Sequence, residues 1–158
     1  MPAVLQHFAQ HKQIRWYQKE AGGQLFAEFD GHDVVVTKAT GPRWSDKRTR
    51  HTYEPNRRAE QREIERLHKA GLHFVGDWHT HAEPVPEPST VDRTSMQEAF
   101  RKSRHALNAF IMVIVGQVEA PGGLYVAVCD QVGVYPLKPS ASAQLRPEVG
   151  RRPTRRIL

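Results

Sequence analysis

The stretch that decides the fold is His73-Phe-Val-Gly-Asp-Trp-His-Thr-His81. It has none of the apolar spacing of a helix, and its aromatic residues suit a pleated surface, so a strand is predicted here. Three prolines, at positions 84, 86 and 88, prevent regular structure between His81 and Ser89. The strand is therefore expected to end in a stiff loop.

A helix is predicted after this loop. Side chains follow a helical period at Met96, Phe100, Ser103 and Leu107. Asp92 would lie in the first turn, where a carboxylate favours the positive end of the helix dipole. The chain from 73 to 107 is thus predicted as strand, loop and helix.

Further strands and one more helix are expected around this unit. The run from Phe110 to Val115 is wholly apolar and predicts a strand buried on both faces. The other expected elements are an antiparallel pair of strands at 24–29 and 34–37, a helix between Asn56 and Gly71, and strands at 124–128 and 132–137. The sequence therefore predicts an α/β (α+β) fold with a mostly antiparallel central sheet flanked by helices.

The net charge of +6 is concentrated near the C-terminal end of the 158 residues. Residues 138–158 hold six basic residues and one acidic residue, and they contain almost nothing to bury. We expect one domain over residues 1–137, followed by a basic, disordered tail over 138–158. Because the remaining chain is nearly neutral, the high pI does not indicate a nucleic-acid-binding core.

Cysteine content and hydropathy limit the possible location. The single cysteine, Cys129, excludes an intramolecular disulfide framework, and the N-terminal residues lack an apolar signal segment. The longest apolar run, Phe110 to Val115, is far shorter than the roughly 20 residues of a membrane-spanning helix. We expect a cytoplasmic protein with no transmembrane segment and no membrane partner.

The densest group of side chains able to bind a metal is His79 and His81 together with Asp92. Residues two apart on a strand point to the same face and lie about 6.6 Å apart along it, so both imidazoles can reach one ion. Asp92, returned by the proline loop, can supply an oxygen. Two imidazoles and one carboxylate leave a fourth coordination position open, which is the arrangement of catalytic zinc.

Each of these residues also has a structural explanation. A His-x-His pair can arise by chance in a chain with nine histidines. Ser89-Thr-Val-Asp92 has the pattern of a helix capping box, in which Ser89 caps the helix and Asp92 favours its dipole. Capping and metal binding are compatible, and the combination of these features favours a metal site.

A hydrolytic metal site also needs a general base close to the ion. Spacing alone does not choose it. The eligible carboxylates are Glu20, Glu28, Asp30, Asp33, Asp77, Glu83 and Glu87.

The pattern from His79 to Asp92 resembles the JAMM motif of the JAB/MPN+ metallopeptidases, which is His-x-His, about seven to ten residues, then Ser-x-x-Asp. The segment Glu20-Ala-Gly-Gly-Gln-Leu25 is similar to the one that carries an upstream glutamate in those enzymes. The resemblance covers about residues 4–137 and implies a single JAB/MPN-like domain. One departure is Ala82, where many relatives have a proline.

The resemblance also implies roles for individual residues. His79, His81 and Asp92 would bind one catalytic Zn²⁺. Glu20 would be the general acid/base, and Ser89 would donate a hydrogen bond to the oxyanion. The chain would then be a zinc-dependent peptidase or isopeptidase.

A narrower resemblance is to short prokaryotic JAB enzymes, among them the JAB isopeptidases of bacterial CBASS anti-phage operons. It depends on segments such as Ala39-Thr-Gly-Pro-Arg43 and Gly71 to His81. It implies a substrate in which a cGAS-like nucleotidyltransferase, or a ubiquitin-like protein, is joined through its C-terminal tail to a target amine. Cleavage after that tail would reverse the conjugation.

Some features allow other interpretations. Trp44 and Arg43, in the long loop after Ala39, could grip a substrate tail, or they could belong to a solvated loop with one anchoring tryptophan. Two other functions stay open: a non-catalytic MPN-fold module for ubiquitin-like partners, and a nucleic-acid-associated protein that uses the basic tail. Nucleic acid is not expected as a partner, because no aromatic platform accompanies the arginines of the tail.

Overall fold

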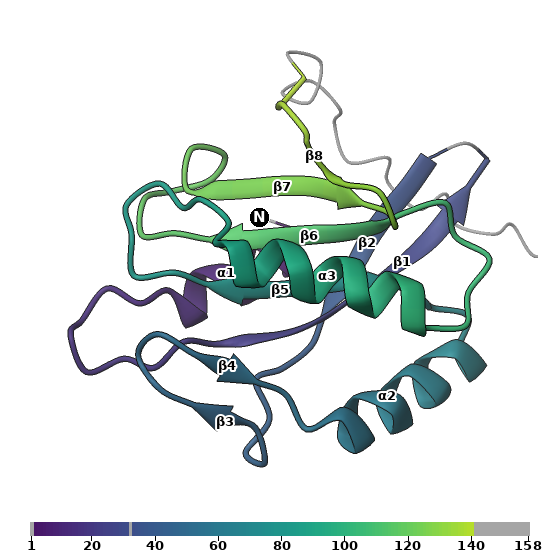
Figure 1. Cartoon of the computed structure of the whole chain (residues 1–158), viewed down its shortest axis with the longest axis horizontal. Coiled ribbons are helices and arrows are strands. Elements are labelled where there is room, and N and C mark those ends of the chain that lie inside the picture. The colour runs from purple at the N-terminus through teal and green to yellow at the C-terminus, as the bar shows by residue number, and fades with distance from the viewer. Residues whose placement is uncertain (1, 32, 141–158) are drawn as a thin grey trace, which may run out of the picture.

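The computed structural model describes residues 2–31 and 33–140, which form three helices and eight strands (Figure 1). In chain order they are α1 (Ala3–His11), β1 (Gly22–Asp30), β2 (Asp33–Ala39), β3 (Lys47–Arg48), β4 (Tyr53–Glu54), α2 (Arg57–Lys69), β5 (His73–Thr80), α3 (Thr90–Lys102), β6 (Phe110–Val115), β7 (Leu124–Cys129) and β8 (Val134–Pro136). The basic tail expected over 138–158 lies outside the described residues from position 141 onward. No helix in the described ranges combines the length and apolar character needed to cross a bilayer.

Six strands form one sheet in the order β2-β1-β5-β6-β7-β8. Only β5 and β6 pair in parallel, and the other four neighbouring pairs are antiparallel. The prediction of a mostly antiparallel central sheet with flanking helices is confirmed. Strands β3 and β4 form a separate short hairpin.

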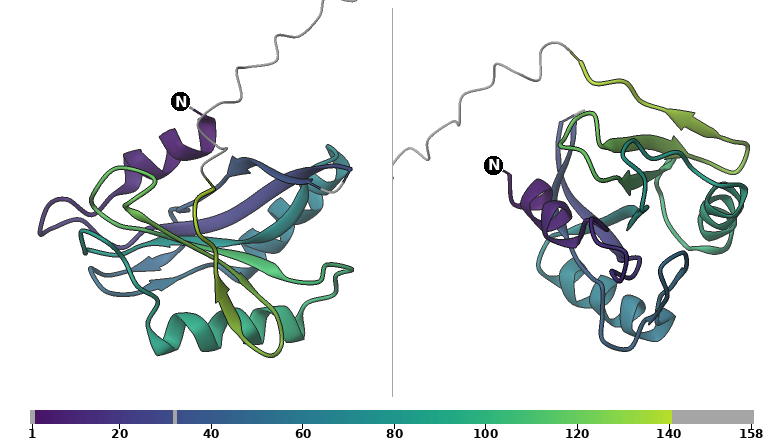
Figure 2. Two further views of the ribbon diagram at one scale, coloured as in Figure 1. Left: turned by 90° about the horizontal axis from the view of Figure 1, so that it is seen from above. Right: turned by 90° about the vertical axis from the view of Figure 1, so that its left-hand side faces the viewer.

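The sheet is covered on both faces (Figure 2). α1 packs on one face, where Phe8 joins Trp78 and Val113 in a buried core. α3 lies on the opposite face, where Met96 packs with Met112 in a second core. Because β6 supplies alternate side chains to both cores, its prediction as a strand buried on both faces is confirmed.

Strand β5 contains a β-bulge that resets which face its side chains occupy. Pairing with β1 skips Val75, between Phe74 and Gly76. Val75 packs in the core under α1, whereas Phe74 packs in the core under α3. Gly76 has φ of +152°, and a Cβ there would lie 1.9 Å from the carbonyl oxygen of Ile111, so only glycine fits. After the bulge, alternate residues from Asp77 onward face the α3 side.

The predicted helix between Asn56 and Gly71 is present as α2. The side chain of Asn56 accepts a hydrogen bond from the backbone N–H of Ala59 at 3.1 Å. Gly71, with φ of +84°, follows the last turn in the left-handed conformation that glycine favours. Most of α2 is exposed, and only Glu60 and Leu67 are buried.

Helix α3 ends earlier than its periodic pattern predicted. It stops at Lys102, so the placement of Ser103 and Leu107 on the helix was wrong. His105 Nε2 donates a hydrogen bond to the carbonyl of Phe100 at 2.9 Å, and this satisfies a carbonyl that the end of the helix leaves free. Leu107 instead packs against the cores from the connection to β6.

Two elements were not predicted. α1 spans nine residues and has no side-chain cap, so it carries little local signal. The β3–β4 hairpin lies in the segment predicted as an irregular surface loop, and each of its strands has only two residues.

Candidate metal centre and active site

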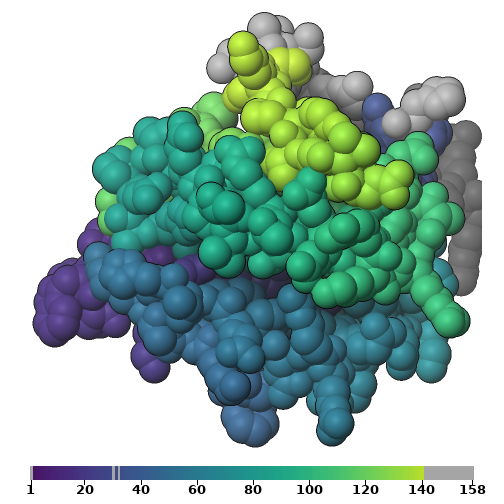
Figure 3. Space-filling model, viewed as in Figure 1, coloured from purple at the N-terminus to yellow at the C-terminus, as the bar shows by residue number. Residues whose placement is uncertain are grey.

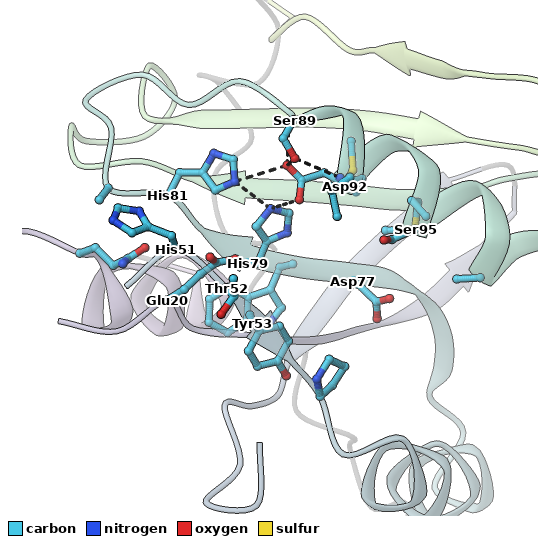
Figure 4. A pocket seen from close by; sticks show the side chains of 18 of the residues that line it. Glu20, His51, Thr52, Tyr53, Asp77, His79, His81, Ser89, Asp92 and Ser95 are labelled. Atoms are coloured by element: carbon cyan, nitrogen blue, oxygen red, sulfur yellow. Dashed lines mark hydrogen bonds and ion pairs between the residues drawn. The ribbon is translucent and has the colours of Figure 1, made fainter. Parts of the chain in front are cut away.

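Strand β5 and helix α3 bring the three predicted metal ligands together. His79 and His81 point to the same side of β5 (Figure 4). Trp78 and Thr80 alternate with them and are buried. The Nε2 atoms of the two histidines are 3.2 Å apart. Asp92 Oδ1 lies 3.2 Å from Nε2 of His79, and Oδ2 lies 3.4 Å from Nε2 of His81.

These separations fit a tetrahedral metal site. Ligand atoms that are each about 2.0–2.1 Å from a zinc ion lie about 3.3 Å apart at the tetrahedral angle. The three separations of 3.2, 3.2 and 3.4 Å therefore match three edges of one such tetrahedron. Two imidazoles and one carboxylate are also donors that zinc accepts. The residues present can hold a four-coordinate divalent metal.

The start of α3 holds Asp92 in place. Ser89 is the N-cap, and its Oγ accepts a hydrogen bond from the backbone N–H of Asp92 at 3.1 Å. In return, the backbone N–H and the hydroxyl of Ser89 each donate to Asp92 Oδ2 at 2.7 Å. The predicted capping box is confirmed. The same conformation of Asp92 makes the capping hydrogen bonds and brings its carboxylate close to the two histidines.

The surrounding charges keep Asp92 ionised. Burial alone would raise the pKa of Asp92, but hydrogen bonds from His79 and His81 hold it well below its usual range. Burial lowers the pKa of His81, yet its hydrogen bond to Asp92 and the nearby charges of Asp92 and Glu20 raise it overall. Once the two imidazoles have lost their protons, they and the ionised carboxylate offer three donor atoms to a cation.

Glu20 lies just before β1, and the two histidines lie between it and Asp92 (Figure 4). Its carboxylate and the ring nitrogens of His79 and His81 lie within 4.8 Å of one another. Glu20 is 8% exposed, and this burial raises its pKa, although the histidine charges oppose the shift. Two residues near β3 fix its main chain: Arg48 Nε donates to the Glu20 carbonyl at 2.6 Å, and the Glu20 N–H donates to Thr49 at 2.7 Å.

A buried polar network that the sequence did not predict ties the Glu20 segment to β5. Thr80 Oγ1 donates to Gln13 Oε1 and accepts from the backbone N–H of Ala21, both at 2.9 Å. Gln13 Nε2 donates to the carbonyl of Arg50 at 2.8 Å. Thr80 lies between the two histidines and Ala21 follows Glu20, so this network sets the position of Glu20 relative to His79 and His81. Because Gln13 and Thr80 are 67 residues apart, no local pattern signals the contact.

The site lies in a cavity of about 470 Å³ between α3 and the segment that runs from β3 into α2. In the space-filling view the surface is hollowed along this boundary (Figure 3). His51 and Thr52 lie on the Glu20 side of His79, and Asp77 lies on the other side (Figure 4). The cavity therefore extends in two directions from the histidines.

The two predicted substrate contacts are not among the described residues that line this cavity. Arg43 forms ion pairs with Glu60, at 3.8 Å, and with Glu63, and it donates to Gln24 Oε1 at 2.9 Å. Trp44 is 99% exposed, so the alternative in which it anchors the loop was wrong. A contact of either residue with substrate stays a prediction.

The fold and the site together define a class of protein, the JAB-type metallopeptidases. The family model for prokaryotic homologs of the JAB domain matches residues 1–128. The chain belongs to this family, and it is a JAMM-type peptidase.

Individual known proteins support this assignment. The chain is 30% identical over 120 residues to a CD-NTase/cGAS isopeptidase of Escherichia coli, covering 74% of each sequence. It is 30% identical over 106 residues to a probable metalloprotease of Sinorhizobium fredii, covering 64% of this chain and 65% of that one. The solution structure of a Desulfitobacterium hafniense protein superposes with a TM-score of 0.60 at 20% identity over 85% of each chain, which supports the fold alone.

Proposed function

We propose that this chain is a zinc-dependent isopeptidase of a bacterial CBASS anti-phage system. The observation that carries the proposal is the convergence of His79, His81 and Asp92 beside Glu20 in one cavity. The proposed substrate is a conjugate in which a cGAS-like nucleotidyltransferase (CD-NTase), or a ubiquitin-like protein, is joined through its C-terminal tail to an amine. The name of the Escherichia coli relative supports the nucleotidyltransferase.

His79, His81 and Asp92 would hold the zinc ion, which when bound polarises the scissile carbonyl. The Glu20 carboxylate accepts a proton from the attacking water and transfers it to the departing amine. Burial raises the pKa of Glu20 in the direction of neutral pH. A carboxyl group whose pKa is closer to neutral pH can both accept and release a proton. Glu20 therefore acts as both general base and general acid.

Ser89 stabilises the negative charge that develops on the carbonyl oxygen. In the structure its hydroxyl donates to Asp92 Oδ2, so it has to rotate to donate to the oxyanion. The backbone N–H of Ser89 keeps its own hydrogen bond to Asp92 during this rotation. Asp92 thus remains in place while the hydroxyl changes its partner.

The cavity favours a flexible tail as substrate. Its walls come from α3 on one side and from the segment between β3 and α2 on the other, which leaves room for an extended chain. A volume of about 470 Å³ cannot hold a folded domain. The folded partners of a conjugate would therefore stay outside while the tail reaches the histidines.

The test uses a fusion of a CD-NTase, joined through its C-terminus to a carrier protein, incubated with and without a chelator. We expect cleavage at the junction, loss of cleavage with the chelator, and recovery with Zn²⁺. Glu20→Gln should bind one zinc per chain but lose about 10²–10⁴-fold in kcat/KM. Product masses locate the scissile bond, and elemental analysis counts the metal.

Glu54→Gln is the matched control. Glu54 is exposed and pairs with Lys47, so removing its charge should leave both activity and metal content unchanged. Cleavage that resists the chelator would contradict the proposal. Metal binding without any cleavage would instead favour the binding-module alternative.

A further inference from the structure

Asp77 lies in the cavity but has no part in the mechanism above. It is on β5, two residues before His79 (Figure 4). Both residues follow the bulge, so their side chains lie on the α3 side of the sheet and line the cavity. Residues two apart on a strand are separated by about 6.6 Å, so Asp77 is one strand repeat away from the metal ligand. A substrate chain that reaches His79 also passes close to Asp77.

The Asp77 carboxylate lacks a partner. Its Oδ1 is buried and makes no hydrogen bond, and within the described ranges Asp77 forms no ion pair. Two basic residues nearby form ion pairs with other carboxylates: Arg57 pairs with Glu60 at 2.9 Å, and Arg43 pairs with Glu63 and lies 3.8 Å from Glu60, although Nη1 of Arg43 makes no hydrogen bond. A buried polar atom in a protein is normally hydrogen-bonded, because leaving it without a partner is costly. A partner for Asp77 is therefore to be sought outside the described residues.

Part of the cavity wall is apolar, although Ser95, Arg57 and Glu60 also line the cavity. Met112 on β6 is the strand neighbour of Asp77, and Met96 and Ala99 of α3 line the same cavity. A long basic side chain suits this arrangement, because its methylene stem can lie against apolar surface while its charged end meets a carboxylate. A short polar side chain would leave the apolar wall uncovered.

We propose that Asp77 is a specificity-determining residue that binds a lysine or arginine side chain of the substrate within about two residues of the scissile bond. The positive end of that side chain pairs with the Asp77 carboxylate, and its stem lies on Met96 and Met112. The proposal rests on the proposed function, because it assumes that a tail passes through the cavity. It adds a sequence preference near the cleaved bond.

The experiment measures this preference directly. Each fusion substrate carries Lys, Gln or Glu at a single position, which is one of the two before or the two after the scissile bond. At one of these positions we expect the wild-type protein to prefer Lys to Gln by at least about tenfold in kcat/KM, and to disfavour Glu most. In Asp77→Asn, which keeps the size of the side chain, the Lys to Gln ratio should fall to near one.

Two further variants support the interpretation. Asp77→Ser serves as a second, smaller replacement and should also lose the preference. Glu54→Gln removes an exposed carboxylate outside the cavity, and it should keep the wild-type ratio. Thermal unfolding of each variant shows whether it is folded.

Binding measurements separate this proposal from the proposed function. On a Glu20→Gln background, labelled peptides spanning the junction are titrated by fluorescence anisotropy, and the Lys peptide should bind at least about fivefold more tightly than the Gln peptide. Adding Asp77→Asn should remove that difference. A Lys preference in binding, with no hydrolysis by the wild-type protein, would overturn the proposed function and retain the role of Asp77. Equal binding of the two peptides, or a preference that survives Asp77→Asn, would overturn the role of Asp77.

Discussion

The two halves of the proposed catalytic site are built in different ways. The ligand half, from His79 to Asp92, lies in one stretch of chain, where strand alternation and a capping box set the side chains. The Glu20 half depends on residues far away in sequence. The carbonyl of Thr49 accepts a hydrogen bond from the Glu20 N–H, and the hydroxyl of Thr80 accepts one from the N–H of Ala21. The proposed metal ligands can thus be positioned by local rules, whereas Glu20, the proposed general base, is positioned only when the sheet and the hairpin have come together.

Replacing Asp92 with alanine should have the largest effect, because Asp92 is proposed as a ligand and is also the partner of the Ser89 cap. We expect zinc affinity to fall by more than about 100-fold and kcat/KM to fall with it. The free energy of unfolding of the metal-free protein should drop by about 1 kcal/mol. Elemental analysis and urea denaturation measure the two effects, and one zinc retained per chain would remove Asp92 from the ligand set.

Ser89 offers a sharper separation of capping from catalysis. Ser89→Ala should lower kcat by about 10²–10³-fold, since it removes the proposed oxyanion donor. It should also cost about 1 kcal/mol of stability, whereas Ser89→Gly should cost only a few tenths, because glycine is tolerated at an N-cap. Equal loss of activity with unequal loss of stability would show two roles. If activity instead followed stability, the catalytic role of Ser89 would be lost.

Thr80→Val tests the distant half. Valine keeps the shape of Thr80 but leaves Gln13 Oε1 and the Ala21 N–H without their partner, which should cost about 1–3 kcal/mol of stability. We expect zinc content to stay at one per chain while kcat falls by about tenfold, because Glu20 is displaced and the ligands are not. Thr90→Val, at an exposed position of α3, is the control. A loss of zinc in Thr80→Val would mean that the two halves do not form independently.

Trp44→Ala examines a residue that belongs to neither half. Because Trp44 is 99% exposed, its removal should change the free energy of unfolding by less than about 0.5 kcal/mol. If the substrate tail extends over the loop after β2, KM should rise by about two- to fivefold with kcat unchanged. Steady-state kinetics on the fusion substrate decide this, and an unchanged KM would remove Trp44 from the substrate contacts.

The smallest expected effect concerns His7 on α1, which contacts the segment after β2. His7 Nε2 donates to the carbonyl of Gly41 at 2.8 Å, and burial, followed by the charge of His11, lowers the pKa of His7 below 6.5. The folded state then binds this proton less readily than the unfolded state, so stability is lost as the pH falls below about 6.5. In His7→Gln the decrease in Tm from pH 7 to pH 5 should be shallower by no more than a few degrees. His51→Gln, at an exposed position, is the control, and an unchanged slope in His7→Gln would contradict the prediction.

Much of the ligand half could be predicted from sequence because each feature depends on close neighbours. The shared face of His79 and His81 follows from strand alternation, and the Ser89 cap follows from a four-residue pattern. By contrast, spacing did not distinguish Glu20 from six other carboxylates, and a family resemblance was needed to choose it. The contact of Gln13 with Thr80 left no local signal, because folding alone brings these residues together.

The end of α3 was mispredicted for a related reason. The apolar period continues past Lys102, but the hydrogen bond from His105 to the Phe100 carbonyl and the return to β6 end the helix. Both are tertiary features. Periodicity describes the face that a helix would present, and it does not give the point at which the chain has to turn back.

The bulge at Val75 makes the length of β5 as important as its composition. The strand consists of two pieces in opposite phase: Phe74 and Val75 pack in the two cores, and the piece that starts at Asp77 carries both the buried Trp78 and the proposed metal ligand His79. Many substitutions in either piece leave this phase relation intact. Deleting one residue at the bulge would exchange the two faces of one piece. That change would put Trp78 into the cavity or move Phe74 away from its core. The number of residues in this strand is therefore constrained in addition to the identity of residues such as Gly76 and His79.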